Sequence, residues 1–137
     1  MADPKESPRT NLARSVLIVE DEYLIALALA ARVEDMGLAV CASVETAAEA
    51  IASAQTHRPA VVLMDVRLKG REDGVDAALV IHKTVGSKVI FVTGSREQAT
   101  IERINLDHPF ATLFKPVTDR QLQGTISDAL HAVPGLE

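Results

Sequence analysis

Polar side chains that could bind a cation and a phosphoryl group follow four separate apolar runs of this sequence. They are Glu20 and Asp21 after residues 16–19, Asp65 after residues 60–64, Thr93 after residues 88–92, and Lys115 after residues 111–114. If the runs are parallel strands of one sheet, their carboxyl ends meet at the edge where open α/β sheets keep their sites. Three carboxylates, a hydroxyl and an ammonium at that edge predict a site for a divalent cation and a phosphoryl group.

The carboxylates are suited to Mg²⁺ or Mn²⁺. Mg²⁺ prefers octahedral oxygen ligands, retains several waters and takes one or two protein carboxylates. Asp21 and Asp65 suit direct ligation, Glu20 suits a contact through water, and the backbone carbonyl of Arg67 is a further candidate ligand. For Glu20 and Asp21 alone, solvated acidic residues at a helix N-terminus remain an equal alternative, because the helix dipole favours negative charge there.

Asp65 is the best candidate for a nucleophile. It ends a fully apolar run in the middle of the chain, so its carboxylate needs a cation as partner, and a metal or Lys115 would supply one. A carboxylate can accept a phosphoryl group as an acyl phosphate. The Thr93 hydroxyl and the Lys115 ammonium could then contact the phosphoryl oxygens, since electrostatic stabilisation dominates phosphoryl transfer.

Strand-like and helix-like patterns alternate five times along the chain. We expect strands at residues 16–19, 38–44, 60–64, 88–92 and 111–114. We expect helices at residues 22–36, from a Thr46–Glu49 cap to before Pro59, at 74–84, from a Ser95–Gln98 cap to before Pro109, and from a Thr118–Gln121 cap onward.

Helical periodicity predicts the faces that two of these helices bury. The first should bury Leu24, Leu27, Ala28 and Ala31, with Ile25, Leu29 and Val33 widening this face. The third should bury Val75, Ala78, Leu79 and His82.

The strands are continuous rather than alternating apolar runs, which indicates burial on both faces of a parallel sheet. We therefore expect an α/β fold, a flavodoxin-like, doubly wound (βα)5 unit with strand order 2-1-3-4-5 and helices on both faces. In this order strands 1 and 3 are neighbours. Glu20, Asp21 and Asp65 would then face one crevice.

Composition narrows the function classes. The chain has 137 residues, enough for one domain, and its net charge of −5 with 14 scattered basic residues argues against binding DNA. The longest apolar stretch, residues 24–31, is too short to span a membrane, and no signal peptide is evident, so we expect a cytoplasmic protein. The single cysteine, Cys41, should be buried. We expect a flexible polar tail at 1–13, one domain at 14–133 and a C-terminal end at 134–137.

The set Glu20-Asp21, Asp65, Thr93-Gly94 and Lys115-Pro116, with Asp73-Gly74 after the third strand, resembles the receiver domain of two-component response regulators. The resemblance covers about residues 14–133. It implies that Asp65 accepts phosphate from a sensor histidine kinase or phosphotransfer protein in a Mg²⁺-dependent reaction. It further implies that Glu20, Asp21 and Asp65 bind the metal, and that Thr93 and Lys115 bind the phosphoryl oxygens.

The sequence departs from the family pattern in two places. Lys69-Gly70 stands where the loop after Asp65 usually has Pro, and Thr112 stands where a switch aromatic is usual. The usual inward rotation of that aromatic ring therefore cannot operate. The segment Phe91–Gly94 is similar to the F-A-T-G segment of an alphaproteobacterial subgroup that also lacks the aromatic.

We expect a stand-alone, single-domain receiver, because the short stretch after Lys115 has room for a closing helix but not for an output module. It should not be an enzyme beyond its own phosphorylation and dephosphorylation. It would signal by phosphorylation-dependent binding of a downstream protein, or act as a phosphate sink, and weak homodimerisation stays open. A non-phosphorylated pseudo-receiver is the alternative, favoured by the absent aromatic. A phosphatase of the haloacid-dehalogenase type fits less well, because it needs a second Asp at position 67, which is Arg, and a cap domain.

Overall fold

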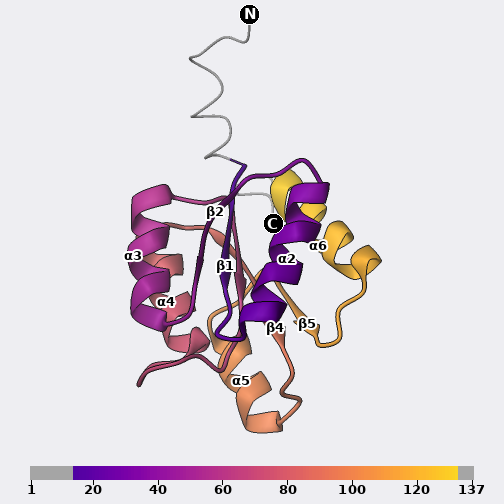
Figure 1. Cartoon of the computed structure of the whole chain (residues 1–137). Coiled ribbons are helices and arrows are strands. Elements are labelled where there is room, and N and C mark those ends of the chain that lie inside the picture. Colours follow the sequence, from indigo (N-terminus) through magenta and orange to yellow (C-terminus); the bar gives the residue numbers. More distant parts are fainter. Residues whose placement is uncertain (1–13, 133–137) are drawn as a thin grey trace, which may run out of the picture.

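The computed structural model describes residues 14–132 and places a five-stranded sheet between two layers of helices (Figure 1). The strands are β1 (Val16–Val19), β2 (Val40–Val44), β3 (Val61–Met64), β4 (Lys88–Thr93) and β5 (Ala111–Phe114). The helices are α2 (Tyr23–Asp35), α3 (Ala47–His57), α4 (Gly74–Thr84), α5 (Gln98–Leu106) and α6 (Asp119–His131). The tail predicted for residues 1–13 and the end predicted for residues 134–137 lie outside the described residues.

The sheet has the predicted order, β2-β1-β3-β4-β5, and its strand pairs are all parallel. The chain therefore changes direction across the sheet between β1 and β3, where a doubly wound fold keeps its crevice. Val19 at the end of β1 pairs with Met64 at the end of β3. Glu20 and Asp65, the next residues of the two strands, consequently emerge side by side.

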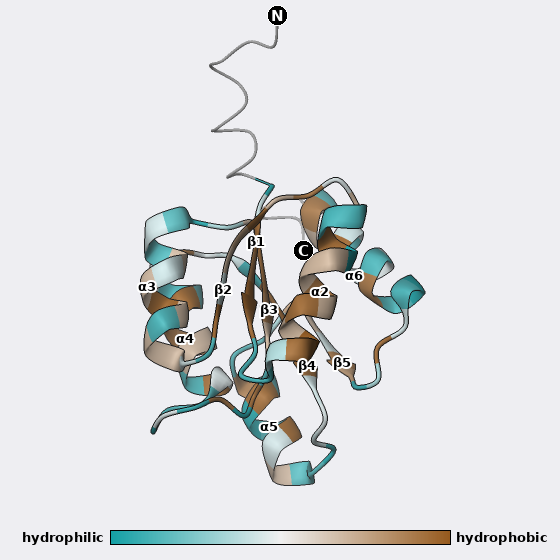
Figure 2. Ribbon diagram, in the orientation of Figure 1, coloured by the Kyte–Doolittle hydropathy of each residue, from teal (hydrophilic) through white to brown (hydrophobic). Residues whose placement is uncertain are grey.

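Alternate strand residues fill two cores. Leu17 and Val19 face the layer of α3, α4 and α5, whereas Val16 and Ile18 face α2 and α6. Figure 2 shows hydrophobic strands at the centre of the molecule, hydrophilic stretches on α3 and α6, and an α2 that is hydrophobic over much of its length. Burial on both faces explains why the strands read as continuous apolar runs.

The buried face predicted for α2 is confirmed at Leu29 and Val33 and wrong at the four residues that were expected to form its centre. Leu24 and Leu27 are 75% and 54% exposed, and Ala28 and Ala31 are exposed as well. The helix buries Ala26, which was not predicted, together with Leu29 and Val33. The physical reason is that α2 is apolar almost all round, so its pattern fits several faces equally well. The connection from β1 decides which face meets the sheet.

Two smaller corrections concern the buried face of α4 and the burial of Cys41. In α4, Val75 and Ala78 are buried as predicted, but Leu79 and His82 are exposed, because the helix turns Ala77 and Ile81 inward instead. Cys41 is half-buried rather than buried, because β2 lies at the edge of the sheet.

Two of the three predicted helix caps are present. Thr46 and Thr118 each accept a hydrogen bond from the backbone N–H three residues on, at 3.1 Å. The predicted Ser95 cap is wrong, and α5 begins at Gln98. Ser95 is used by the preceding loop instead, where its backbone N–H donates to Thr93 Oγ1 and its Oγ accepts from the Glu97 N–H.

The loop after β3 is attached to the rest of the fold at both ends. Lys69 pairs with Thr46 in an isolated parallel bridge, and its Nζ contacts Glu45 Oε1 at 2.7 Å. At the other end Gly74 packs so closely against Asp65 that a Cβ on it would lie 1.9 Å from the Asp65 carbonyl oxygen. None of the helices within residues 14–132 is long and apolar enough to cross a membrane.

A glycine pair tests this close approach. Gly74→Ala should lower the free energy of unfolding by about 1–3 kcal/mol, because its methyl group must displace the backbone at Asp65. Gly124→Ala is the matched control, since Gly124 lies within α6 with open space around it. It should raise stability by about 0.5–1 kcal/mol through helix propensity. Urea unfolding of both variants measures the two values, and equal effects would contradict the packing assigned to Gly74.

Candidate functional site

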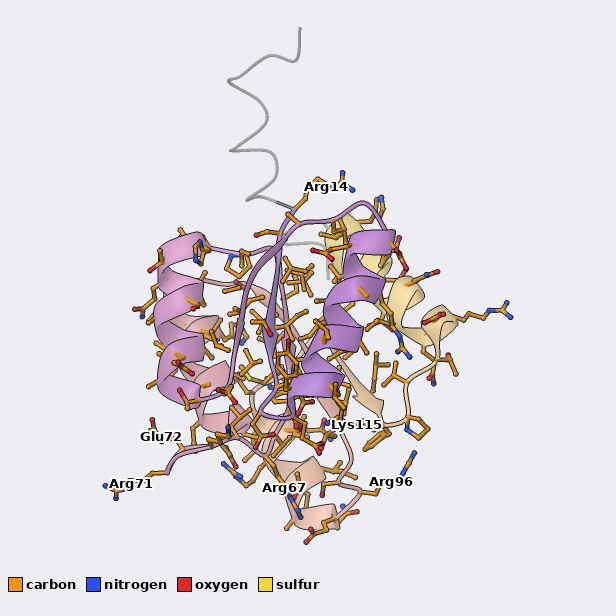
Figure 3. The ribbon with its side chains drawn as sticks, viewed as in Figure 1. Arg14, Arg67, Arg71, Glu72, Arg96 and Lys115 are labelled. Carbon is orange, nitrogen blue, oxygen red and sulfur yellow. The ribbon has the colours of Figure 1, made fainter. Side chains whose placement is uncertain are left out.

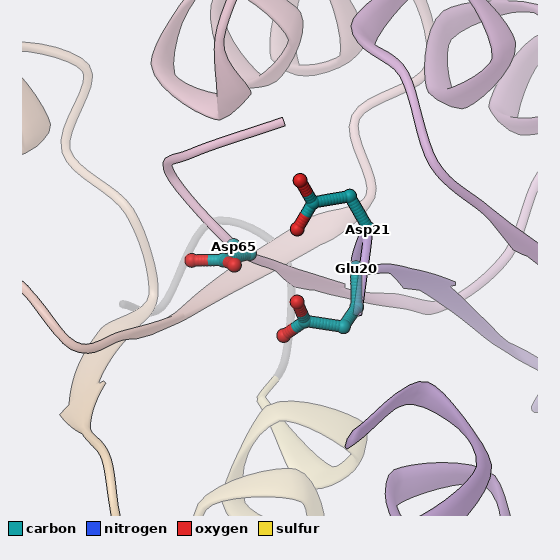
Figure 4. Close-up of side chains that lie close together, drawn as sticks. All are labelled: Glu20, Asp21 and Asp65. Carbon is teal, nitrogen blue, oxygen red and sulfur yellow. The ribbon is translucent and has the colours of Figure 1, made fainter. Parts of the chain in front are cut away.

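The carboxyl ends of β1, β3, β4 and β5 bring the predicted site residues to one edge of the sheet. Glu20, Asp21 and Asp65 each offer a carboxylate oxygen, and these three oxygens lie within 4.8 Å of one another (Figure 4). Lys115 and Arg67 lie at the same end of the molecule, beside α5 (Figure 3). The gathering of these groups was predicted from the strand order.

Backbone hydrogen bonds fix the two buried carboxylates. The Asp65 N–H donates to the Val19 carbonyl at 2.9 Å, which continues the β1–β3 pairing one residue past the strands. One oxygen of each carboxylate then accepts from a neighbouring backbone N–H: Glu20 Oε2 from Glu22 at 3.1 Å and Asp65 Oδ1 from Val66 at 2.8 Å. The side chains of Glu20 and Asp65 are consequently held with their second oxygens toward the crevice.

Lys115 occupies the space between those second oxygens. Its Nζ donates to Glu20 Oε1 at 2.8 Å and to Asp65 Oδ2 at 3.2 Å. Its backbone N–H donates to the Thr93 carbonyl at 2.8 Å, so the ends of β4 and β5 stay in register. One ammonium thus neutralises part of the charge of two carboxylates that are almost fully buried.

Burial and, after it, the negative charge of Glu20 raise the pKa of Asp65 to about 6, although Lys115 opposes them. For Lys115, burial lowers the pKa, but the hydrogen bond with Glu20 and the charges of Asp65 and Glu20 outweigh it, so the pKa is raised. Lys115 therefore stays an ammonium at neutral pH. Burial and the charge of Glu20 disfavour the ionised form of Asp65, and a bound cation would favour it.

The donor set fits a hard divalent cation. Three carboxylates and one ammonium leave a net charge of −2 when all are ionised, and all of the offered ligand atoms are oxygens. Mg²⁺ and Mn²⁺ prefer such ligands. Asp21 is half-buried and lines the cavity described below, so a cation held there keeps positions open for water or phosphate.

A cavity of about 680 Å³ opens onto the site. Asp65 lines it although only 7% of that residue is exposed. Thr93 lines it too, and its Oγ1 accepts a hydrogen bond from the Ser95 N–H at 3.1 Å. Asp65, Thr93 and Lys115 therefore face one space that is large enough for a phosphoryl group.

Of the charged residues around the mouth of this cavity, the sequence indicated Arg67 but neither Arg96 nor Glu97. Arg67 contacts Glu97 with 3.6 Å between its Nη2 and Oε1 of Glu97, and the Arg96 guanidinium lies over the Phe114 ring, 4.4 Å from its centroid. Both arginines and Glu97 line the cavity. They stand in loops, where side-chain pairing leaves no periodic signal. The predicted role of the Arg67 carbonyl as a metal ligand stays a prediction.

Comparisons with known proteins agree with this geometry. The model of the response regulator receiver domain matches residues 16–127. The chain is 31% identical over 133 residues to the transcriptional regulatory protein PdtaR of Mycobacterium tuberculosis, covering 97% of this chain and 61% of that protein. It is 36% identical over 122 residues to the phyllosphere-induced regulator PhyR of Methylorubrum extorquens, covering 88% of this chain and 45% of that protein. It thus spans less than two thirds of either relative.

Solved structures show the same fold. The signal receiver domain of a modulated diguanylate cyclase from Desulfovibrio desulfuricans matches with a TM-score of 0.82 at 34% identity, covering 87% of this chain and 94% of that one. A CheY-like receiver domain protein from Methanospirillum hungatei matches with a TM-score of 0.79 at 27% identity, covering 86% and 94%. The chain therefore belongs to the receiver domains of two-component response regulators.

Proposed function

We propose that this chain accepts a phosphoryl group on Asp65 in a Mg²⁺-dependent reaction and thereby controls the binding of a downstream protein. The observation that carries the proposal is the contact of one ammonium, Lys115, with both Glu20 and Asp65 at the floor of an open cavity. A structural ion pair of this kind needs no such opening. A phosphoryl acceptor does need one.

The transfer forms one bond and breaks another. A carboxylate oxygen of Asp65 attacks the phosphorus of a phosphohistidine, the new O–P bond forms, and the P–N bond breaks. Its electron pair returns to the imidazole nitrogen, which takes a proton from solvent. Bound Mg²⁺ supplies positive charge to the phosphoryl oxygens, with Glu20, Asp21, Asp65 and the Arg67 carbonyl as its proposed ligands.

Thr93 and Lys115 have roles that do not depend on the metal. The Lys115 ammonium already lies 3.2 Å from Asp65 Oδ2, so it would remain beside a phosphoryl group attached there. The Thr93 hydroxyl would donate to a phosphoryl oxygen from the wall of the same cavity. Both residues stand where β4 and β5 end, so their movement would reach α5, β5 and α6.

Receiver domains interact with histidine kinases or phosphotransfer proteins, and we propose one of these as the phosphodonor. Output through a bound protein and service as a phosphate sink both fit this proposal. A stand-alone domain at residues 14–133, membership of the F-A-T-G subgroup, a cytoplasmic location and weak homodimerisation stay predictions. The pseudo-receiver alternative, which Thr112 favours, differs in predicting no phosphorylation at all.

Intact-mass measurement tests the acceptor directly. Incubation with acetyl phosphate and Mg²⁺ should add one phosphoryl group to the wild type and none to Asp65→Asn, and removal of Mg²⁺ with a chelator should abolish the addition. Asp128→Asn is the matched control, because Asp128 is exposed on α6, and it should be phosphorylated like the wild type. A wild type that gains no phosphoryl group would support the pseudo-receiver instead.

The raised pKa of Asp65, about 6 against a usual value of 3.8, predicts a pH-dependent stability. The folded state holds the proton more tightly than the unfolded state, so stability is present at low pH and is lost as the pH rises from about 4 to about 6. The free energy of unfolding of the wild type should therefore fall by about 2–3 kcal/mol relative to Asp65→Asn between about pH 4 and pH 7 without Mg²⁺. Urea unfolding at several pH values measures this difference, and Mg²⁺ should reduce it. A difference that stays constant with pH would show that burial does not disfavour the Asp65 carboxylate.

An exposed apolar face of α2 offers a docking place for the phosphodonor. Tyr23, Leu24 and Leu27 are 74%, 75% and 54% exposed. Leu24 also lines an apolar groove of about 480 Å³ whose wall includes Pro116 and Lys115. Because Lys115 lines both this groove and the cavity over Asp65, a donor helix seated on α2 would place a phosphohistidine near the acceptor.

Leu27→Ser separates docking from chemistry. It should lower kcat/KM for transfer from a phosphorylated histidine kinase by about tenfold, because apolar contact area is lost, and leave phosphorylation by acetyl phosphate unchanged. The kinase for this experiment is chosen from a panel of histidine kinases as the one that phosphorylates the wild type fastest. Leu106→Ser is the control, since Leu106 is 79% exposed on α5, and transfer to it should be unaffected. Equal losses in both variants would argue against docking on α2.

A further inference from the structure

An exposed ion pair joins two loops at the mouth of the Asp65 cavity. Arg67, two residues after Asp65, places its Nη2 3.6 Å from Oε1 of Glu97. Glu97 is the residue that precedes α5, and its carbonyl accepts the first-turn hydrogen bond from the Ile101 N–H at 3.0 Å. Arg67 and Glu97 both line the cavity. The pair therefore links the loop after β3 to the start of α5.

Among the cations that line the cavity in the described part of the chain, Arg67 is held more weakly than Lys115. The side chains of Arg67 and Glu97 are 81% and 71% exposed, so water screens their attraction. Lys115 contacts two buried carboxylates, and the Arg96 guanidinium lies over the Phe114 ring. The Glu97 side chain makes no capping hydrogen bond to α5. Arg67 is consequently moved to a new anion more easily than Lys115.

We propose that Arg67 binds the phosphoryl group on Asp65 and leaves Glu97 in order to do so. The inference rests on the proposed function, because it needs a phosphoryl group at Asp65. Such a group brings close to two negative charges and several oxygens. The planar guanidinium fork of Arg matches those oxygens better than it matches one solvated carboxylate at 3.6 Å.

The exchange would carry the signal to α5. Once Arg67 moves to the phosphoryl group, Glu97 loses the contact that ties the start of α5 to the loop after β3. The first turn of α5 then becomes free to rearrange. No aromatic ring on β5 is needed for this step, and the position usual for that ring holds Thr112. A change of charge at one residue thus biases a helix end.

Beryllofluoride, a tetrahedral anion that binds carboxylates as a phosphoryl group does, is the probe. With Mg²⁺ present, Arg67→Ala should weaken its binding by about five- to tenfold, because a charge-assisted hydrogen bond is lost. Glu97→Gln should strengthen binding by about twofold, because Arg67 no longer has a competing partner. Arg71→Ala is the matched control on the same loop. Arg71 lines a different cavity with Thr46 and Lys69, and its variant should bind like the wild type.

The opposite signs of the two changes decide between the proposal and a merely structural ion pair. If the pair only holds the loops together, breaking it from either end shifts affinity in one direction, and that result overturns the inference. A wild type that binds beryllofluoride no better than Arg67→Ala also overturns it, while leaving the proposed function intact. A wild type that binds no beryllofluoride overturns the proposed function itself.

Hydrogen exchange of the amides in the first turn of α5 tests the consequence. Beryllofluoride should speed exchange of the Ile101 amide in the wild type, because the N–H of this residue donates to the Glu97 carbonyl. Glu97→Gln and Arg67→Ala should show the faster exchange already without the anion and change little when it is added. Both side chains are exposed, so the variants are expected to fold. Unchanged exchange in the wild type would remove the link between Arg67 and α5.

Discussion

Two nearly buried carboxylates can lie side by side at the end of this sheet because one ammonium contacts both. An unpaired charge in such a place would cost several kcal/mol, and two like charges would cost more. Lys115 reaches Glu20 and Asp65 from β5, past the end of β4, and this reach exists only in the strand order observed. The charge pairing in the site therefore depends on the strand order of the sheet.

The backbone around Asp65 transmits that constraint outward. Gly74 packs against the Asp65 carbonyl, and the preceding residue, Asp73, caps α4 through the backbone N–H groups of Val75 and Asp76. Burial raises the pKa of Asp73, but hydrogen bonds with Arg103 on α5 and nearby groups outweigh it, so its pKa is lowered and the pair with Arg103 stays charged. A change at Asp65 can thus reach α5 through α4 as well as across the mouth of the cavity.

The sequence predicted the strands, whose apolar pattern recurs along the chain. It failed in part for the helix faces and for one of the caps, where one sequence pattern is compatible with several structures. Continuous apolar runs predicted the strands, and the five alternations of strand and helix predicted a doubly wound order in which Glu20, Asp21 and Asp65 meet. The centre of the buried face of α2 was predicted wrongly, although Leu29 and Val33 are buried as expected, because an all-apolar helix has no preferred face and tertiary contacts selected one. The Ser95 cap was wrong because the loop uses Ser95 beside Thr93. Pairing of exposed arginines has no sequence period, so no pattern could have found it.

One of the two departures from the family pattern lies in the loop after β3. The position usual for Pro holds Lys69, whose backbone bridges to Thr46 and whose side chain contacts Glu45 at 2.7 Å. Both charged groups of that pair are more than half exposed, so water screens their attraction, and the backbone bridge sets the position of the loop. The loop is therefore held without a proline, beside Thr46 through Lys69 and beside Asp65 through the close packing of Gly74.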